Sequence, residues 1–346
     1  MNAGAAPESL TPPPADPSAP PAGGADRRSA WQRALRRRGV RELLLLGALA
    51  ALGLLLLLRS LALQPHLAAL WRIDDGTHLQ LASSALPALR GLAGAQLQRI
   101  GSADGQWLQA DASLLQRSPR WSASDAARAQ QRQVQQQLAT MLRGGALTLQ
   151  FADGRQGAVQ PEARGLRGLG PFIWLASAGS LALLLAAAAV LQQHPPLRNL
   201  PYAALALCQA CSLLAIGVET LPGLGLPLAY LQHGQWARWA LDLGSAAAMV
   251  QLAATQPLRL PAGRWIAAGV WVLCAGVATL AARQALAQAW WWTQAAMLGC
   301  GLLTLALCAS VAHAINPAQH AGMLFHLVSG GSMIGAFFIV TDPVSG

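Results

Sequence analysis

Lysine is absent from this sequence of 346 residues, and all 24 basic side chains are arginines. Without lysine no Schiff base can form with retinal or pyridoxal phosphate, so both of those protein classes are excluded. The lysine of a phosphate-binding P-loop is missing for the same reason. The sequence also contains no HExxH and no GxSxG pattern, which removes the commonest zinc-protease and serine-hydrolase signatures.

Charge of either sign is scarce. Charged residues make up 11% of the chain, against about 25% in a typical soluble domain. Hydrophobic residues make up 54%, and the mean hydropathy is +0.37. This balance predicts several bilayer-spanning helices rather than one water-soluble core. The net charge of +10 then indicates membrane orientation and contact with the lipid bilayer, and no nucleic-acid partner is expected.

Cysteine is also sparse, and its placement argues against disulfides. The five cysteines, at positions 208, 211, 274, 300 and 308, all fall in apolar segments. A disulfide framework is therefore not expected. Cys208 and Cys211 lie three residues apart, on one face of a predicted helix, which leaves a metal or redox pair open beside simple packing.

The N-terminal region, residues 1–41, is predicted to be a cytoplasmic tail. Its first 26 residues are rich in proline, alanine and glycine, cannot bury much apolar surface, and are expected to be disordered. Seven arginines follow between positions 27 and 41. They precede a long apolar stretch, residues 42–63, which carries Arg59 near its far end and is predicted to be a retained transmembrane helix.

Residues 64–169 are polar and are predicted to form one small α+β domain outside the cytoplasm. Alternation around positions 74–76 indicates a strand and a turn. Residues 146–159 indicate a hairpin with Asp153 and Gly154 at its turn. Residues 124–142 indicate a helix, with Ser124 or Asp125 as its N-cap.

Six further apolar segments follow the polar region, each about the length that crosses a bilayer. They cover residues 171–191, 202–218, 237–254, 265–282, 290–312 and 323–340. Five of them form a predicted bundle over residues 170–316, and the last belongs to a final segment, residues 317–346. The expected fold is therefore mainly α: a polytopic membrane helical bundle of about seven spans with one small α+β extracytoplasmic domain.

Two charged residues interrupt one of these segments. Arg238 and Asp242 lie four residues apart, on one face of the predicted helix. Charges inside a membrane segment are functional candidates, although these two can also simply pair with each other. Glu219, at the end of the preceding segment, could join them. The histidines at positions 313, 320 and 326 cluster around the last loop, as scattered interfacial residues or as ligands brought together by the fold.

The closing segment, "HLVSGGSMIGAFFIVTDPVSG", covers residues 326–346. Gly331 and Gly335 form a G-x-x-x-G step, beside the small residues Ser329 and Gly330. Small residues let a helix backbone approach a neighbouring helix or a flat ligand closely. Pro343, which has no N–H, ends the apolar run just after Asp342.

The order of residues in this segment closely resembles the RnfD/NqrB family. Its members are the RnfD membrane proteins of Rnf electron-transport complexes and their NqrB relatives in the sodium-pumping NADH:quinone reductase. That family reads like H-L-x-S-G-G-x-x-x-G-A-F-F-x-x-T-D-P-V. The matching residues are His326, Leu327, Ser329, Gly330, Gly331, Gly335, Ala336, Phe337, Phe338, Thr341, Asp342, Pro343 and Val344.

The resemblance implies a flavin-containing component of a bacterial inner-membrane complex, which couples electron flow to sodium or proton translocation together with other membrane subunits. FMN or riboflavin would then lie against the small residues Ser329, Gly330, Gly331 and Gly335. Asp342, a carboxylate at a membrane boundary, would lie near the ion path. No metal site is expected.

The chain departs from the family pattern in three ways. The S-G-A-T pattern, whose threonine carries a covalent flavin, does not occur. The family has no polar domain of this size after its first helix. Its pattern also continues beyond D-P-V, so the closing segment is expected to be truncated relative to it. The layout of residues 1–316 favours an alternative: the input half of a bacterial sensor, with residues 64–169 as ligand-binding domain. A membrane scaffold without a cofactor is a third hypothesis.

Overall fold

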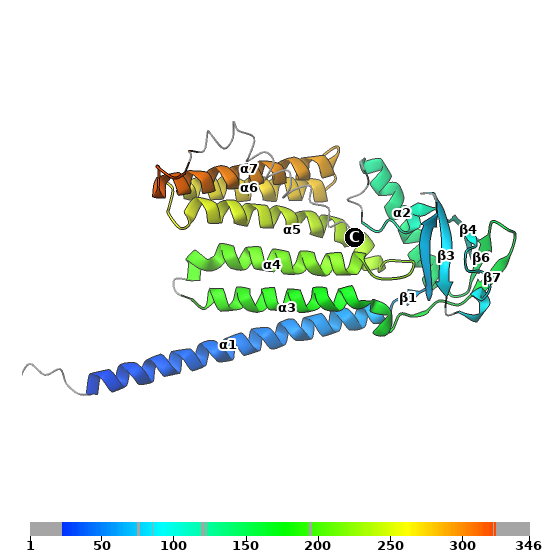
Figure 1. Ribbon diagram of the computed structural model, residues 1–346, viewed down its shortest axis with the longest axis horizontal. Coiled ribbons are helices and arrows are strands. Elements are labelled where there is room, and N and C mark those ends of the chain that lie inside the picture. Colours follow the sequence, from blue (N-terminus) through cyan, green and yellow to red (C-terminus); the bar gives the residue numbers. More distant parts are fainter. Residues whose placement is uncertain are drawn as a thin grey trace, which may run out of the picture. The chain divides into compact units, whose positions relative to one another are not determined.

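The computed structural model describes residues 23–320 and 322, except 75–76, 85, 119–121, 123 and 194–195 (Figure 1). For residues 23–39 and 196–197 it describes the backbone alone. The chain divides into two compact units, residues 1–45 and 46–346. The described part of the first unit is the beginning of one long helix, and the second unit holds all the other elements.

The helices and strands follow one another in a simple order. The α-helices are α1 (Gly23–Ala62), α2 (Asp125–Arg143), α3 (Pro171–Leu191), α4 (Pro196–Glu219), α5 (Leu228–Thr255), α6 (Gly263–Ala282) and α7 (Ala289–Ile315). The strands are β1 (Pro65–His66), β2 (Ala69–Asp74), β3 (His78–Ser84), β4 (Gln96–Ser102), β5 (Trp107–Gln109), β6 (Leu147–Phe151), β7 (Gln156–Val159) and β8 (Glu162–Ala163). Short 3-10 turns cover Pro87–Leu89, Ala112–Leu114 and Arg167–Leu169.

Five helices in the described part of the chain are long and apolar enough to cross a membrane. They are Val40–Ala62 within α1, Pro171–Leu191, Arg198–Glu219, Gly263–Ala282 and Ala289–Ile315. The predicted span at residues 237–254 is helical but belongs to α5, whose first half carries glutamine, histidine, arginine and aspartate and lowers its apolarity. The predicted span at residues 323–340 lies outside the described residues. The described residues therefore contain five of the seven predicted spans, and the number of seven is not confirmed.

Helix α5 is the central element of the helical bundle. It packs against α4 on one side and against both α6 and α7 on another, and α3 packs on the far side of α4 (Figure 1). Its buried residues are mostly small or apolar, among them Leu243, Ala247, Ala248 and Val250. Two polar residues of α5, Arg238 and Ser245, are buried among them.

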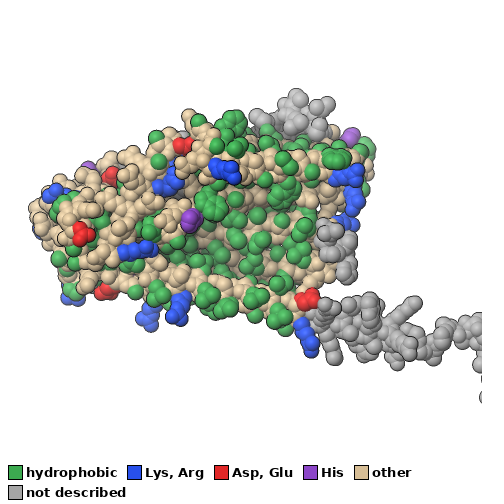
Figure 2. Space-filling model, turned by 180° about the vertical axis from the view of Figure 1, so that it is seen from behind, with side chains coloured by type: hydrophobic (Ala, Val, Ile, Leu, Met, Phe, Trp, Pro, Cys, Tyr) green, Lys and Arg blue, Asp and Glu red, His purple; other side chains and the backbone are tan. Residues whose placement is uncertain are grey.

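The outer faces of the bundle are apolar. Leu175 on α3 is 69% exposed, and Trp265 and Val272 on α6 are 70% and 74% exposed. Figure 2 shows hydrophobic side chains spread over one face of the helical part. Because exposed apolar surface on this scale is unfavourable in water, these faces are suited to lipid, and the chain is a multi-pass membrane protein.

Residues 64–169 form the polar domain, in which β1 pairs with β8 and the other six strands form one antiparallel sheet. Its strand order is β2-β3-β4-β6-β7, with β5 paired to β4. The predicted hairpin is present: β6 pairs with β7 around a turn where Gly154 has a φ of 84°. The strand predicted near residue 74 is β2, and it pairs with β3. Asp153 stabilises that turn, because its Oδ1 accepts a hydrogen bond from the N–H of Arg155 at 2.9 Å.

Helix α2 packs with the sheet around one apolar core. The predicted cap is present, since the Ser124 hydroxyl accepts a hydrogen bond from the N–H of Ala127 at 3.2 Å. The core side chains include Leu79, Leu81, Ile100, Leu138, Leu149 and Phe151. Leu224 is also part of this core, although it comes from the loop between α4 and α5.

Candidate functional site

A small cavity, named the junction cavity, lies where α2 of the polar domain meets α4, α5 and α7. Its volume is ≈ 40 Å³, which is room for roughly three water molecules. The polar domain contributes Arg117, Gln131, Arg132 and Gln135. The helices contribute Glu219, Tyr230, Gly234, Gln235, Arg238, Trp239, Asp242, Trp290 and Gln294. Three guanidinium groups and two carboxylates therefore face one small space.

The predicted charged pair lies at this cavity. Arg238 Nε and Asp242 Oδ1 are 3.8 Å apart, and their side chains are 8% and 13% exposed. Arg238 also donates a hydrogen bond from Nη1 to the backbone oxygen of Ser212 on α4, at 2.6 Å. The arginine is therefore held between two helices and is kept away from lipid, as a charge within a membrane segment requires.

Glu219 reaches the same cavity from the C-terminal end of α4, as the sequence suggested. Tyr230 donates its phenolic hydrogen to Glu219 Oε1 at 2.6 Å. This hydrogen bond joins the end of α4 to the first turn of α5. Two carboxylates therefore line the cavity. Glu219 lies near the α4–α5 loop, and Asp242 lies further along α5.

The polar domain's contribution was not predicted from the sequence. Gln131 and Gln135 lie four residues apart on the buried face of α2, with 7% and 2% of their surface exposed. Gln135 donates a hydrogen bond from Nε2 to the backbone oxygen of Leu114 at 2.9 Å. Its Oε1 takes no part in this bond. The available signal was the run of glutamine and arginine in residues 128–137, which indicates a polar helix but not its partner.

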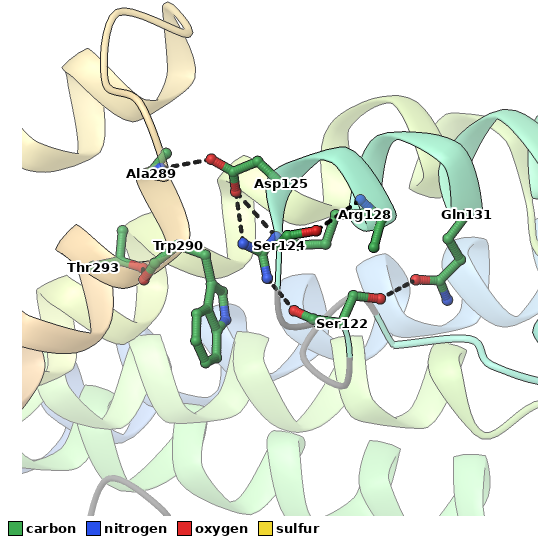
Figure 3. Close-up of polar contacts among 9 residues, drawn as sticks. Ser122, Ser124, Asp125, Arg128, Gln131, Ala289, Trp290 and Thr293 are labelled. Atoms are coloured by element: carbon green, nitrogen blue, oxygen red, sulfur yellow. Dashed lines mark hydrogen bonds and ion pairs between the residues drawn. The ribbon is translucent and has the colours of Figure 1, made fainter.

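One side of the cavity is closed by contacts between α2 and α7. Figure 3 shows Asp125 between Arg128 of its own helix and the start of α7. Asp125 Oδ1 accepts from Arg128 Nη2 at 2.6 Å, and its Oδ2 accepts from the N–H of Ala289 at 2.9 Å. The guanidinium carbon of Arg128 lies 5.0 Å from the centre of the Trp290 ring. Asp125 therefore caps α7 from another part of the chain, where the helix dipole favours a negative charge.

The loop between α4 and α5 closes the other side. Arg117 donates a hydrogen bond to the backbone oxygen of Gly223, and Arg164 donates to those of Pro222 and Gly225. Burial lowers the pKa of Arg117 to about 10, and burial together with the nearby Arg117 charge lowers that of Arg164 to about 10. Both groups remain cationic at neutral pH, and both bind carbonyl oxygens of the loop.

The remaining sequence-predicted residues are not brought to this cavity. Cys208 and Cys211 are half-buried on α4, and the structure places no third ligand with them: the described residues contain no group of three or more metal-binding side chains. His313 Nδ1 lies 2.7 Å from the backbone oxygen of His320, and His326 lies outside the described residues. Ser329, Gly330, Gly331, Gly335 and Asp342 also lie outside them.

The junction cavity does not fit a flavin. A space for roughly three waters is smaller than three fused rings, and it is bordered by charged side chains rather than by the small residues predicted for close approach. The predicted flavin contacts at residues 329–335 are therefore a separate hypothesis from this cavity.

The resemblance predicted for the closing segment is confirmed, and it extends further upstream. Residues 227–346 match the family described as NQR2, RnfD, RnfE. This match begins at the residue before α5 and includes α6, α7 and the closing segment. All the residues of α5 that line the junction cavity thus fall within the matched part.

Curated relatives agree with the family match over a shorter stretch. They are the D-type subunits of the ion-translocating oxidoreductase complex from Salmonella paratyphi B and Salmonella newport, each 57% identical to the chain over 44 residues. That stretch is 13% of this chain and 12% of each relative, so the chain spans about an eighth of the length of these relatives. No solved structure matches the chain.

Proposed function

We propose that the chain is a membrane subunit of an ion-translocating oxidoreductase complex of the Rnf/Nqr type, working with partner subunits in a bacterial inner membrane. The observation that carries this proposal is the family match over residues 227–346, which coincides with the part of the bundle that holds the charged helix α5. Five apolar helices supply the membrane setting. Neither the family match nor the relatives support the sensor alternative.

The proposal includes a topology. The seven arginines at positions 27–41 favour a cytoplasmic N-terminus, and the polar domain would then lie on the opposite side. The junction cavity, between that domain and the bundle, faces the side to which ions are delivered or from which they are taken.

The proposal also includes a flavin, FMN or riboflavin, bound near Ser329, Gly330, Gly331 and Gly335. When bound, a flavin supplies one- and two-electron transfer. The small residues of this chain would provide a surface that fits the flat flavin ring, because a glycine backbone lets the ring approach closely. The missing S-G-A-T pattern implies non-covalent binding, so the flavin should leave the protein on denaturation.

The test is purification of the full chain from native membranes under mild detergent. Co-purification of further membrane subunits and a releasable flavin, identified by chromatography and fluorescence, is expected. Gly331→Leu should lower the flavin content, whereas Gly299→Leu should not, because a side chain at Gly299 on α7 would meet open space. A chain that purifies alone and colourless would contradict the proposal.

A further inference from the structure

One face of α5 is polar along its first half. Tyr230, Gly234, Arg238 and Asp242 lie four residues apart, so they share a face, and all four line the junction cavity. Since an α-helix rises about 1.5 Å per residue, the α5 residues that line the cavity are spread over about 18 Å of the helix. It reaches from the α4–α5 loop well into the bundle.

Buried polar atoms without a hydrogen-bond partner are gathered around this cavity. The acceptors are Oε1 of Gln135 and Oε1 of Gln235, and the donors are Nε of Arg132 and Nε1 of Trp290. Leaving such groups unsatisfied costs about 1–3 kcal/mol each. Because water both donates and accepts, a small cluster of water molecules satisfies both kinds of atom, and the volume of the cavity suits it.

A second cavity, named the distal cavity, opens at the other end of α5. Its volume is ≈ 440 Å³, and it is lined by Arg198 and Tyr202 of α4, Met249 and Leu252 of α5, and Thr304 and Cys308 of α7. Gln256 also lines it, and the rest of its lining is mostly apolar, including Leu205, Ala253 and Pro257. Helix α5 therefore borders a cavity at each end. The two cavities share no lining residue.

A short packed stretch of α5 separates the two cavities. From Asp242 to Met249 the helix advances about 10 Å. Leu243, Ala247 and Ala248 in this stretch are at most 1% exposed. One polar contact interrupts it: Gln209 of α4 donates a hydrogen bond from Nε2 to the Ser245 hydroxyl at 3.2 Å.

We propose that α5 lines an interrupted proton path: water in the junction cavity connects Glu219 with Asp242 from one side, the distal cavity opens from the other, and the packed stretch at residues 243–248 is the gate between them. A proton that leaves one carboxyl group is taken up by a water molecule, which gives another of its protons to the other carboxylate; the water is regenerated, the donor is left as a carboxylate and the acceptor is protonated. This inference rests on the proposed function and extends it by assigning the ion and the helix.

The charges favour a proton over a metal cation. Arg117, Arg132 and Arg238 face the junction cavity with Glu219 and Asp242, which leaves a formal excess of one positive charge. A bare cation such as Na⁺ would be repelled and would need most of the oxygen ligands that the arginines already use. A proton moves by exchange of hydrogen bonds and needs only water and the two carboxyl groups.

The geometry is tested by thiol accessibility in the full chain, in intact cells and in inverted membrane vesicles. Cys308 serves as the reporter of the distal cavity, after Cys208, Cys211, Cys274 and Cys300 are replaced by alanine. Gln235→Cys reports the junction cavity, and Ala247→Cys reports the packed stretch, each in a chain without Cys308. The reagent is a small, charged, membrane-impermeant methanethiosulfonate, which reacts only where water reaches the thiol.

Labelling of Gln235→Cys is expected from the side of the polar domain, labelling of Cys308 from the opposite side, and no labelling of Ala247→Cys from either. Val272→Cys, on the exposed apolar face of α6, is the control for lipid exposure and should stay unlabelled. Labelling of Ala247→Cys at the rate of the other two would overturn the gate. An unreactive Gln235→Cys, or both cavities reacting from one side, would overturn the path.

The ion is tested in inverted vesicles that contain the assembled complex, energised with NADH or reduced ferredoxin. Proton movement should fall on the order of a hundredfold in Asp242→Asn and be largely restored in Asp242→Glu, since a positioned proton-transfer group is worth about that much. Sodium movement that depends on Asp242 would overturn the proton assignment. Vesicles without any redox-driven ion movement would refute the proposed function, while the labelling pattern would still decide the geometry.

Discussion

Arg128 shows how a charged side chain is accommodated at the boundary between the polar domain and the bundle. Its side chain is 1% exposed, and it is paired with Asp125 at 2.6 Å and stacked on Trp290. A buried cation is tolerated only if nearby groups replace the water it loses. Here a carboxylate, a backbone oxygen of Ser122 and an aromatic face do so.

Replacing Arg128 by methionine should therefore destabilise the protein, because Asp125 and the Ser122 oxygen lose their partner. The expected loss is about 2 kcal/mol of unfolding free energy, the size found for hydrogen bonds to charged groups. Denaturant unfolding of the full chain in detergent, followed by tryptophan fluorescence, measures it. Arg155→Met is the matched control: that pair is exposed and should contribute little. Equal losses in both variants would contradict the role given to Arg128.

His66 makes stability depend on pH. Desolvation lowers its pKa below the usual 6.5, although its Nδ1 contact with the backbone oxygen of Glu162 acts in the other direction. The folded protein thus binds this proton less readily than the unfolded chain. The contribution of the neutral His66 to the free energy of unfolding is fully present above pH 6.5. It is lost as the pH falls through the lowered pKa of the folded protein.

A thermal-stability profile between about pH 8 and about pH 5 should show this decline, and His66→Gln should make it shallower. The substitution keeps the size and polarity of the side chain but removes its titration. An unchanged slope in the variant would assign the decline to other groups.

At the scale of elements, the α4–α5 loop depends on backbone conformations that favour glycine. Gly225 has a φ of 92°, and a Cβ added there would overlap Leu142 Cδ1 of α2. Gly154, at the β6–β7 turn, has a φ of 84° but open space around it. The two positions therefore share backbone strain and differ only in crowding.

Gly225→Ala should cost about 3 kcal/mol and Gly154→Ala about 1 kcal/mol, because only the first adds a steric clash to the left-handed backbone. Chemical unfolding of both variants measures the difference. Comparable losses of unfolding free energy in the two variants would show that the loop can shift away from α2 and is not tightly packed against the polar domain.

At the scale of the whole molecule, the core of the polar domain is separate from those of the helical bundle but takes in one residue of the α4–α5 loop. Leu224 belongs to the α4–α5 loop, yet it is fully buried among the core side chains of the polar domain. Arg117 and Arg164 fix the same loop through its carbonyl oxygens. A change in the polar domain can therefore reach the first turn of α5, where the junction cavity begins.

Leu224→Ala should lower the unfolding free energy by about 2–5 kcal/mol, the usual cost of a cavity in a packed core. Hydrogen exchange should increase in both the loop at residues 220–227 and the strands of the polar domain, because one side chain serves both. Leu258→Ala, in the exposed α5–α6 loop, should change neither. Faster exchange in the loop alone would mean that the polar domain folds independently of it.

Much of the local structure followed from the residues. The β6–β7 hairpin, the strand β2, the Ser124 cap and most apolar helices were predicted, because turn glycines, capping side chains and long apolar runs act over a few neighbouring residues. Strand β4 was not predicted, although it joins β3 to β6 at the centre of the sheet. Its pairing is long-range and leaves only a weak alternation in the sequence. Helix α5 was predicted as a span at residues 237–254 alone, because its first half is too polar to be recognised by hydropathy.

The sequence by itself determined that the chain is a membrane protein with a polar insert, because composition and the length of apolar runs do not depend on how the helices meet. It also determined the i, i+4 spacing of Arg238 and Asp242 and the resemblance of the closing segment. Only the tertiary structure decided that Glu219, Arg117 and Gln135 share a cavity with that pair. Those residues are far apart in the chain. They come together because α2 packs against α5 and Leu224 is buried in the core of the polar domain, and local sequence patterns encode neither contact.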